Sequence, residues 1–356
     1  MNVKALVIGG TGPTGPYVVG GLLERGYEVS ILHRGTHEVD LPPEVEHIHG
    51  DPHFEDTLEE ALGKRKFDLA VGMYGRLRFV AQVAKRHVTR FISVGAAGVY
   101  QGWHSRAAPE DILIPTPEET PLQDDREVDI FSYRMVEAES EVIKAHQAGY
   151  YNATHFRYPM IYGPRQLAPQ EWCILRRILD GRSRLILPDG GLTIRSRGYA
   201  QNMAHALLLA VDEPEKSSGQ IYNVSDERLL TLRSWISLIC RVMNYQFEFV
   251  EMPYSLARPA RVYSWGSYHQ VTDITKVKEQ LGYMDVVPVA KAIELTAKWY
   301  LENHPAGEVE EQLRDPFDYA TEDRLIEEFE AGWQHVRELA PPRLGFHHPY
   351  AHPKHP

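Results

Sequence analysis

A glycine-rich segment near the start of the chain carries the strongest chemical signal in the sequence. It reads GGTGPTG from Gly9 to Gly15, with Gly12 midway, and follows the apolar run Val3–Ile8. A strand that ends in such a turn and opens a helix presents backbone N–H groups and the positive end of the helix dipole to a phosphate. Glycine is needed because a side chain would obstruct the turn, the approach of a pyrophosphate or helix–strand packing. The segment predicts a dinucleotide site; the alternative is a glycine-rich turn without a ligand.

The residues on either side of this turn have the pattern of a strand, a helix and a second strand. Lys4–Ile8 is expected as a buried strand, and Pro16 suits the first turn of a helix. We expect that helix over Tyr17–Arg25, ended by Gly26, and a second strand over Glu28–His33. This is the βαβ context in which a glycine-rich turn binds a dinucleotide.

Strand and helix patterns alternate through the first half of the chain and become less regular after residue 158. Regular alternation predicts an α/β fold with a Rossmann-type, doubly wound parallel sheet, whose ligands bind at the carboxyl ends of the strands. The second half predicts a smaller mixed α/β C-terminal lobe, with a ligand cleft between the lobes. After the first two strands, the expected elements of the first half are strands at Val45–His49, Asp68–Val71, Arg90–Val94 and Ala153–Tyr158 and helices at Asp56–Leu62, Leu77–His87 and Asp129–Ala148.

This pattern suggests three parts. We expect an NAD(P)-binding domain over residues 1–165, to which some later segments return, and a substrate-binding lobe over residues 166–304. Residues 305–356 form a C-terminal extension with one amphipathic helix, Ala320–Leu339, that we expect to dock on the body. Its apolar face consists of Leu325, Ile326, Phe329, Trp333 and Val336. No metal site is predicted, because prolines prevent a regular ligand spacing among His347, His348, His352 and His355.

Composition and charge are those of an ordinary folded protein. The 356 residues are 43% hydrophobic and 24% charged, and the net charge is −11, from 38 basic and 49 acidic side chains. That charge disfavours a broad nucleic-acid surface. The N-terminus enters a strand at once and no apolar run reaches membrane-spanning length, so we expect neither a leader nor a membrane partner. Cys173 and Cys240 are expected as buried thiols, which favours a cytoplasmic protein.

Several further motifs occur in a fixed order along the chain. They are GD at Gly50–Asp51, VY at Val99–Tyr100, VEAE at Val136–Glu139, RYPMIYGPR at Arg157–Arg165, IYNVSDE at Ile221–Glu227 and the late segment Asp273–Gly282. With the glycine segment, they resemble the extended short-chain dehydrogenase/reductase superfamily, in particular its NAD-dependent epimerases and dehydratases. The resemblance covers about residues 1–304 and implies the same fold and a nicotinamide dinucleotide.

The resemblance implies which residues hold that cofactor. The pyrophosphate would lie against the glycine segment, and the adenine would face the carboxylate that follows the third strand. The residues after the fourth strand would lie near the nicotinamide ribose, and those that end the sixth strand near the nicotinamide ring. In this order, the residues are Gly9, Thr11, Gly12 and Gly15; Asp51; Met73, Tyr74 and Gly75; and Tyr158 and Pro159.

The end of the second strand bears on the choice between NAD and NADP. An acidic residue there accepts hydrogen bonds from a ribose 2′-hydroxyl, whereas an arginine neutralises a 2′-phosphate. The chain has His33 where the acid would stand and Arg34 beside it. We therefore expect NADP rather than NAD; the alternative is that Arg34 is merely solvated at a strand end.

The resemblance also implies a proton relay, and here the chain departs from the family pattern. The family has a tyrosine and a lysine four residues apart on a helix, and the lysine lowers the pKa of the tyrosine. Alignment on the motifs places Phe131 and Met135 at these positions, and Ala96 at that of the usual serine or threonine. Shifting the register to Tyr133 puts Glu137 at the lysine position, where a carboxylate raises the tyrosine pKa. The chain resembles an atypical member that lacks the catalytic set.

Three residues on the loops after the fourth and fifth strands remain as candidates for the acid or base. They are Tyr74, Tyr100 and His104. Tyr100 has an alternative interpretation as packing at a strand end, and His104 as a solvated loop residue.

A stretch of the second half, LTIRSRGYAQNMA, resembles the substrate-binding stretch of the family. This implies that Arg195 contacts a substrate phosphate, with Tyr199 one turn further on. Phe131 and Met135 would add an apolar wall to the cleft. A small hydrophobic or aromatic metabolite is therefore expected as the substrate.

Three functions stay open on the sequence alone. The first is an enzyme of unusual mechanism, either an NAD(P)-dependent oxidoreductase or a redox-neutral isomerase or lyase. The second is a catalytically silent regulator that senses NADP. The third is an RNA-associated protein on the same fold, against which the acidic net charge counts. Family members commonly pair through two long helices, here Leu77–His87 and Asp129–Ala148, so we expect a homodimer.

Overall fold

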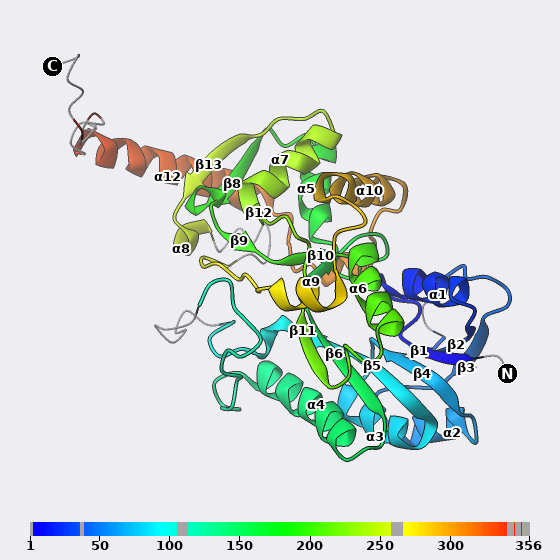
Figure 1. Ribbon diagram of the computed structural model, residues 1–356. Coiled ribbons are helices and arrows are strands. Elements are labelled where there is room, and N and C mark those ends of the chain that lie inside the picture. Colours follow the sequence, from blue (N-terminus) through cyan, green and yellow to red (C-terminus); the bar gives the residue numbers. More distant parts are fainter. Residues whose placement is uncertain are drawn as a thin grey trace.

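A computed structural model describes residues 3–35, 39–104, 113–257 and 266–339, together with Gly345 and Tyr350. These residues form a larger lobe around a parallel sheet and a smaller C-terminal lobe (Figure 1). The sheet has seven strands in the order β11-β6-β5-β4-β1-β2-β3, and every neighbouring pair is parallel. The strands are β1 (Lys4–Ile8), β2 (Glu28–His33), β3 (Glu46–His49), β4 (Phe67–Gly72), β5 (Val88–Ala96), β6 (Asn152–Tyr158) and β11 (Gln220–Asn223). This confirms the predicted Rossmann-type fold.

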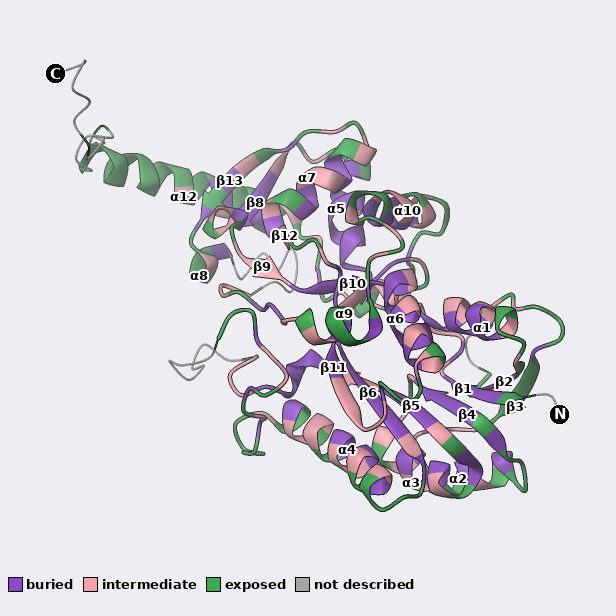
Figure 2. Ribbon diagram, viewed as in Figure 1, coloured by how far each residue is buried: buried purple, intermediate pink, exposed green. Residues whose placement is uncertain are grey.

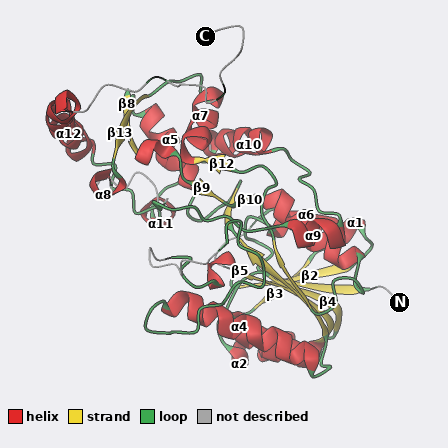
Figure 3. Ribbon diagram, turned by 60° about the vertical axis from the view of Figure 1, so that its left-hand side comes forward, coloured by secondary structure: helices red, strands yellow, loops and turns green. Residues whose placement is uncertain are grey.

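Helices cover both faces of the sheet (Figure 3). Alternate residues of a strand point to opposite faces, and in β1 Ala5 and Val7 join one apolar core while Leu6 and Ile8 join another. The first core includes residues of α1 (Gly15–Glu24), α6 (Ala200–Asp212) and α9 (Thr275–Leu281). The second core includes residues of α2 (Glu55–Leu62), α3 (Leu77–His87) and α4 (Ile130–Gln147). Thus α6, β11 and α9, from residues 166–304, pack in the larger lobe.

The smaller lobe is built around a third apolar core. This core joins α5 (Gln170–Leu179), α7 (Leu232–Val242) and α10 (Val289–Glu302) to the parallel pair β8 (Arg184–Pro188) and β13 (Glu248–Met252). Cys173 and Cys240 are buried as free thiols. Short elements complete the lobe and its junction with the sheet: β7 (Met160–Tyr162), β9 (Ile194–Arg195), β10 (Arg197–Tyr199), β12 (Leu230–Thr231), α8 (Tyr254–Ala257), α11 (Glu308–Glu311) and the single 3-10 turns Ala97–Val99 and Asp189–Gly191.

The C-terminal helix α12 (Tyr319–Leu339) docks along only part of its length. Ile326 is buried in the third core, and Leu325 and Phe329 pack against it. Further along the helix, Trp333 is 39% exposed and Val336 48%, and the end of the helix projects from the lobe (Figures 1 and 2). The prediction of a docked amphipathic helix is therefore right for the first half of α12 and wrong for the second. The histidines of the tail, from His347 on, lie outside the described residues.

None of the helices that the structure describes combines the length and hydrophobicity needed to cross a lipid bilayer.

Candidate functional site

The glycine turn lies where the order of the strands reverses. β1 has β2 on one side and β4 on the other, so the turn after β1 opens at the crevice where doubly wound sheets bind ligands. Gly9 has a φ of +93°, and a Cβ on it would lie 2.5 Å from the Cβ of Tyr74. A Cβ on Gly15 would lie 2.1 Å from the carbonyl oxygen of Gly10. These two glycines are therefore required by the fold of the turn.

A pocket of about 280 Å³ opens above this turn. It extends from the ends of β1 and β2, past the ends of β4 and β5, to the segment that follows β6. Of the predicted cofactor residues, it is lined by Gly9, Thr11, Gly12, Arg34, Met73, Tyr74 and Tyr158. Gly15, Asp51, Gly75 and Pro159 do not line it. The lining is completed by residues that were not predicted as cofactor contacts, namely Pro13, Thr14, His33, Gly35, Val94, Ile161, Gln166 and Leu167.

Asp51 and Gly75 lie close to the pocket although neither lines it. Asp51 accepts hydrogen bonds from the backbone N–H of His53 at 3.0 Å and from its Nδ1 at 2.7 Å. Burial favours the protonated form, but these two bonds hold the pKa of Asp51 below its ordinary value. Gly75 has a φ of +94°, and the following Arg76 N–H donates to Pro52 O at 3.0 Å. The loops after β3 and β4 are thereby fastened together.

The other end of the pocket is apolar. Tyr158 is buried, and its hydroxyl donates to the carbonyl oxygen of Met203 at 3.1 Å. Burial raises the pKa of Tyr158 well above its ordinary value, so the phenol keeps its proton, which it donates to Met203 O. Among the described residues that line the pocket there is neither a lysine nor a carboxylate.

His104 and Phe131 come together beside the start of α4. Their ring centroids are 6.0 Å apart, and Phe131 is 54% exposed. Asp129 caps α4, accepting from the N–H groups of Phe131 and Ser132. Burial lowers the pKa of His104. The positive charge of Arg195 lowers this pKa as well, whereas the negative charge of Asp129 raises it. The lowered pKa favours the neutral imidazole, and His104 lies close to the position where the resemblance puts the missing tyrosine.

The other two positions of the usual catalytic set lie on β5 and α4. Ala96 ends β5 and is half-buried, and Met135 lies one turn after Phe131 on α4, also half-buried. Neither side chain carries a group that titrates.

Tyr100 lies in a buried polar network, which corrects its assignment as a candidate acid or base. It is 1% exposed, its hydroxyl donates to Asn223 Oδ1 at 2.6 Å, and it accepts from Arg157 Nη1 at 2.8 Å. Burial raises the pKa of Tyr100 to about 12. Arg157 in turn pairs with Glu139 at 2.7 Å. Tyr100 thus joins β5, β6 and β11 in the interior of the large lobe.

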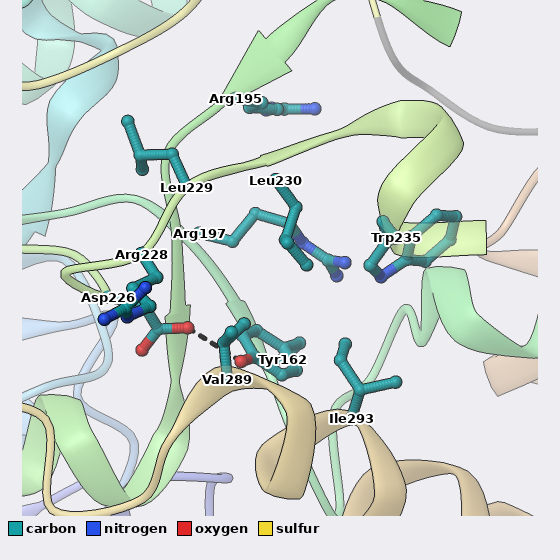
Figure 4. Close-up of a pocket in the computed structure, with 10 residues that line it drawn as sticks. All are labelled: Tyr162, Arg195, Arg197, Asp226, Arg228, Leu229, Leu230, Trp235, Val289 and Ile293. Atoms are coloured by element: carbon teal, nitrogen blue, oxygen red, sulfur yellow. Dashed lines mark hydrogen bonds between the residues drawn. The ribbon is translucent and has the colours of Figure 1, made fainter. Parts of the chain in front are cut away.

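Arg195 lies at a separate, small pocket of the smaller lobe (Figure 4). This pocket holds only about 10 Å³, the space of one water molecule. Burial and the neighbouring Arg197 lower the pKa of Arg195 to about 10. Figure 4 shows the Tyr162 hydroxyl bonded to Asp226 at 2.7 Å, with Arg197 reaching toward Trp235. Arg195 thus lines a different pocket from the one at the glycine turn.

Tyr199 is a core residue, which corrects its assignment to the substrate cleft. It is 1% exposed, and its ring centroid lies 5.5 Å from that of Tyr162. Its backbone N–H donates to Asp226 Oδ1 at 3.0 Å.

Comparison with known proteins shows that part of the chain is similar to a known family. Residues 70–225 match the model of the NAD dependent epimerase/dehydratase family. This stretch is less than half of the chain, and over it the chain is similar to that family. The chain is also 26% identical over 244 residues to the chloroplast stem-loop binding protein of 41 kDa b of Arabidopsis thaliana, covering 64% of this chain and 60% of that protein. Since less than two thirds of this relative is spanned, its name does not define the activity of this chain.

Solved structures of epimerases share the fold. The UDP-glucose 4-epimerase of Thermotoga maritima with UDP-glucose matches with a TM-score of 0.69 at 20% identity, covering 85% of this chain and 100% of that one. The UDP-glucuronic acid 4-epimerase of Bacillus cereus, in complex with UDP-glucuronic acid and NAD, matches with a TM-score of 0.63 at 16% identity, with the same coverage.

The residues of the pocket fit a nicotinamide dinucleotide. A Cβ on Gly12 would project with no protein atom nearer than Gly9 O at 3.5 Å, so the glycine leaves open space at the pocket wall. Thr14 lies at the start of α1, where the helix dipole favours a phosphate. Arg34 supplies a positive charge at the adenosine end. A bound nicotinamide would supply hydride transfer at the apolar end near Tyr158.

Proposed function

We propose that the chain is an NADP(H)-dependent enzyme of the epimerase/dehydratase type that acts on a small hydrophobic or aromatic metabolite. The observation that carries the proposal is the pocket itself, in which a glycine turn at the switch point of the sheet adjoins Arg34 at the end of β2. Among the described residues that line the pocket there is no carboxylate beside Arg34, which supports a 2′-phosphate at this end. The apolar side chains of Phe131 and Met135 at the usual tyrosine and lysine positions support a hydrophobic substrate.

The preference for NADP is tested by direct binding. The wild type should bind NADPH with a change in its fluorescence, and Arg34→Ala should weaken NADPH about tenfold while leaving NADH within about twofold, since one charge-assisted contact is lost only with the phosphate. Titration of both dinucleotides against both proteins measures this. Equal losses for the two dinucleotides would discard the NADP preference.

His104 is proposed as the group that accepts a proton from a substrate hydroxyl during oxidation and returns it during reduction. A neutral imidazole suits this role, and burial and Arg195 lower the pKa of His104, which favours that form. His104→Gln should lower turnover of NADPH with a panel of aromatic and aliphatic ketones by about 100-fold or more, as removal of a general acid–base typically does, with little change in NADPH affinity. Retention of full turnover in this variant would reject His104.

A silent NADP-sensing regulator is the second candidate, favoured by the apolar side chains at Ala96, Phe131 and Met135. The double variant Phe131→Tyr, Met135→Lys distinguishes this regulator from the proposed enzyme. An inactive wild type that gains turnover from this pair would support the regulator, whereas an active wild type that does not need the pair supports the enzyme. Pairing through α3 and α4 into a homodimer stays a prediction.

A further inference from the structure

A row of four side chains crosses the adenosine end of the pocket. The guanidinium carbon of Arg34 lies 5.6 Å from the centroid of the Tyr74 ring. The Tyr74 ring meets that of His53 edge-on, with centroids 5.1 Å apart and an interplanar angle of 86°. His53 Nδ1 in turn lies 2.7 Å from Asp51 Oδ1. The row therefore joins the loops that follow β2, β4 and β3 at the edge of the sheet where ligands bind.

The backbone holds Tyr74 firmly in this row. The absence of a side chain on Gly9 allows the Cβ of Tyr74 to approach the glycine turn, where a Cβ would be 2.5 Å away. On its other side, Gly75 packs against Pro52, where a Cβ would be 2.6 Å from the proline Cβ. The ring itself is 40% exposed and faces the pocket. Tyr74 is therefore a fixed platform, whereas Arg34 is a long side chain at the surface.

The charge of Arg34 is available to a ligand. No described carboxylate lies within ion-pair distance of its guanidinium, in contrast to the paired arginines Arg25 and Arg86 of the same lobe. An unpaired arginine side chain samples many rotamers, and ordering it on binding costs affinity. Stacking on an aromatic ring reduces this cost because it restricts the guanidinium before the ligand arrives.

We propose that Tyr74 is a specificity-determining residue, whose ring holds the Arg34 guanidinium in place so that the site selects adenosine carrying a 2′-phosphate. This inference rests on the proposed function and deepens it. It assigns Tyr74 to cofactor selection instead of proton transfer, and the aromatic ring, not the hydroxyl, is the part that acts. His53 supports the ring from its far edge and is itself held by Asp51.

The test uses fragments that occupy only the adenosine end. Adenosine 2′,5′-bisphosphate and 5′-AMP are titrated calorimetrically into the full-length wild type, Tyr74→Ala, Tyr74→Phe and Arg34→Ala. Tyr74→Ala should weaken the bisphosphate about two- to fivefold, the range of an exposed cation–π contact, and should leave 5′-AMP unchanged. Tyr74→Phe should match the wild type for both fragments. In the Arg34→Ala background, Tyr74→Ala should no longer distinguish the fragments.

Tyr150→Ala provides the matched control. Tyr150 is 56% exposed and lies under Lys85 Nζ at 5.1 Å, so the substitution removes the same kind of contact outside the pocket. It should change neither affinity. A Tyr74→Phe variant as weak as Tyr74→Ala, or an equal effect of Tyr74→Ala with and without Arg34, would overturn the inference while leaving NADP binding intact. If neither fragment nor NADPH binds the wild type, the proposed function itself fails.

Discussion

Replacing Arg177 by leucine should destabilise the smaller lobe by about 3–5 kcal/mol, the cost of breaking a buried ion pair by removing one partner. The Arg177 side chain is fully buried on α5. It donates to Asp315 at 2.6 and 3.0 Å, to the carbonyl oxygen of Cys173 at 2.9 Å and, at short range, to Glu322 of α12. The side chains of Asp315 and Glu322 are 0% and 3% exposed. The variant leaves two carboxylates without their cation in the interior.

The deficit should depend on pH with a definite sign. Burial already raises the pKa of Glu322, and Arg177 opposes that rise, so loss of the arginine should raise the pKa of Glu322 further. A carboxyl whose pKa is higher in the folded than in the unfolded state binds more protons when folded, so stability falls as pH rises through that interval. Denaturant unfolding of Arg177→Leu should therefore show a smaller deficit at pH 5 than at pH 8.

Arg176→Leu is the control for this prediction. Arg176 precedes Arg177 on α5 and pairs with Asp180 and Glu310, but its side chain is 38% exposed. Exposed pairs contribute about 0–1 kcal/mol, so this variant should unfold close to the wild type. Limited proteolysis should also cut the extension faster in Arg177→Leu than in Arg176→Leu. Equal behaviour of the two variants would contradict the role of Arg177 as the anchor of α12.

The periodic elements were predictable because their signals are local. Glu28–His33 and Leu77–His87 have the predicted bounds, since hydrophobic alternation, a glycine stop or a charged turn marks each end within a few residues. The two- and three-residue strands β7, β9, β10 and β12 were missed. Their pairing partners are far away in the sequence, as Arg197 is from Met160. Segments this short also show no hydrophobic periodicity.

The candidate site could be predicted only where a short sequence motif by itself determines the local backbone geometry. The glycine turn does so, and Gly9, Gly12 and Arg34 line the pocket as expected. Gln166 and Leu167 reach the same pocket from the other lobe, and nothing in their local sequence indicates that. Tyr100 and Tyr199 illustrate the converse: a tyrosine near the right strand end is a candidate in the sequence, but whether its hydroxyl faces a cleft or a buried partner depends on tertiary contacts.

The second large effect is expected at Gly12, where affinity and stability should separate. Gly12 is outside the left-handed region of φ, and a Cβ there would have only ordinary contact, 3.5 Å from Gly9 O. Gly12→Ala should therefore change the free energy of unfolding by less than about 0.5 kcal/mol. Its methyl group would enter the pocket at the expected pyrophosphate position, so NADPH affinity should fall at least tenfold, about 1.4 kcal/mol or more. Thermal unfolding and NADPH titration measure the two quantities.

Two other glycines, one in the same turn and one in α1, provide comparisons for this result. Gly20→Ala, inside α1 with no atom within 4 Å of its Cβ, should stabilise the protein by about 0.5–1 kcal/mol and leave binding unchanged. Gly15→Ala would place its Cβ 2.1 Å from Gly10 O, so stability and binding should be lost together. Only a phosphate-binding turn predicts that Gly12→Ala loses affinity alone. A Gly12→Ala protein that binds NADPH as tightly as the wild type would mean that the turn does not hold the pyrophosphate.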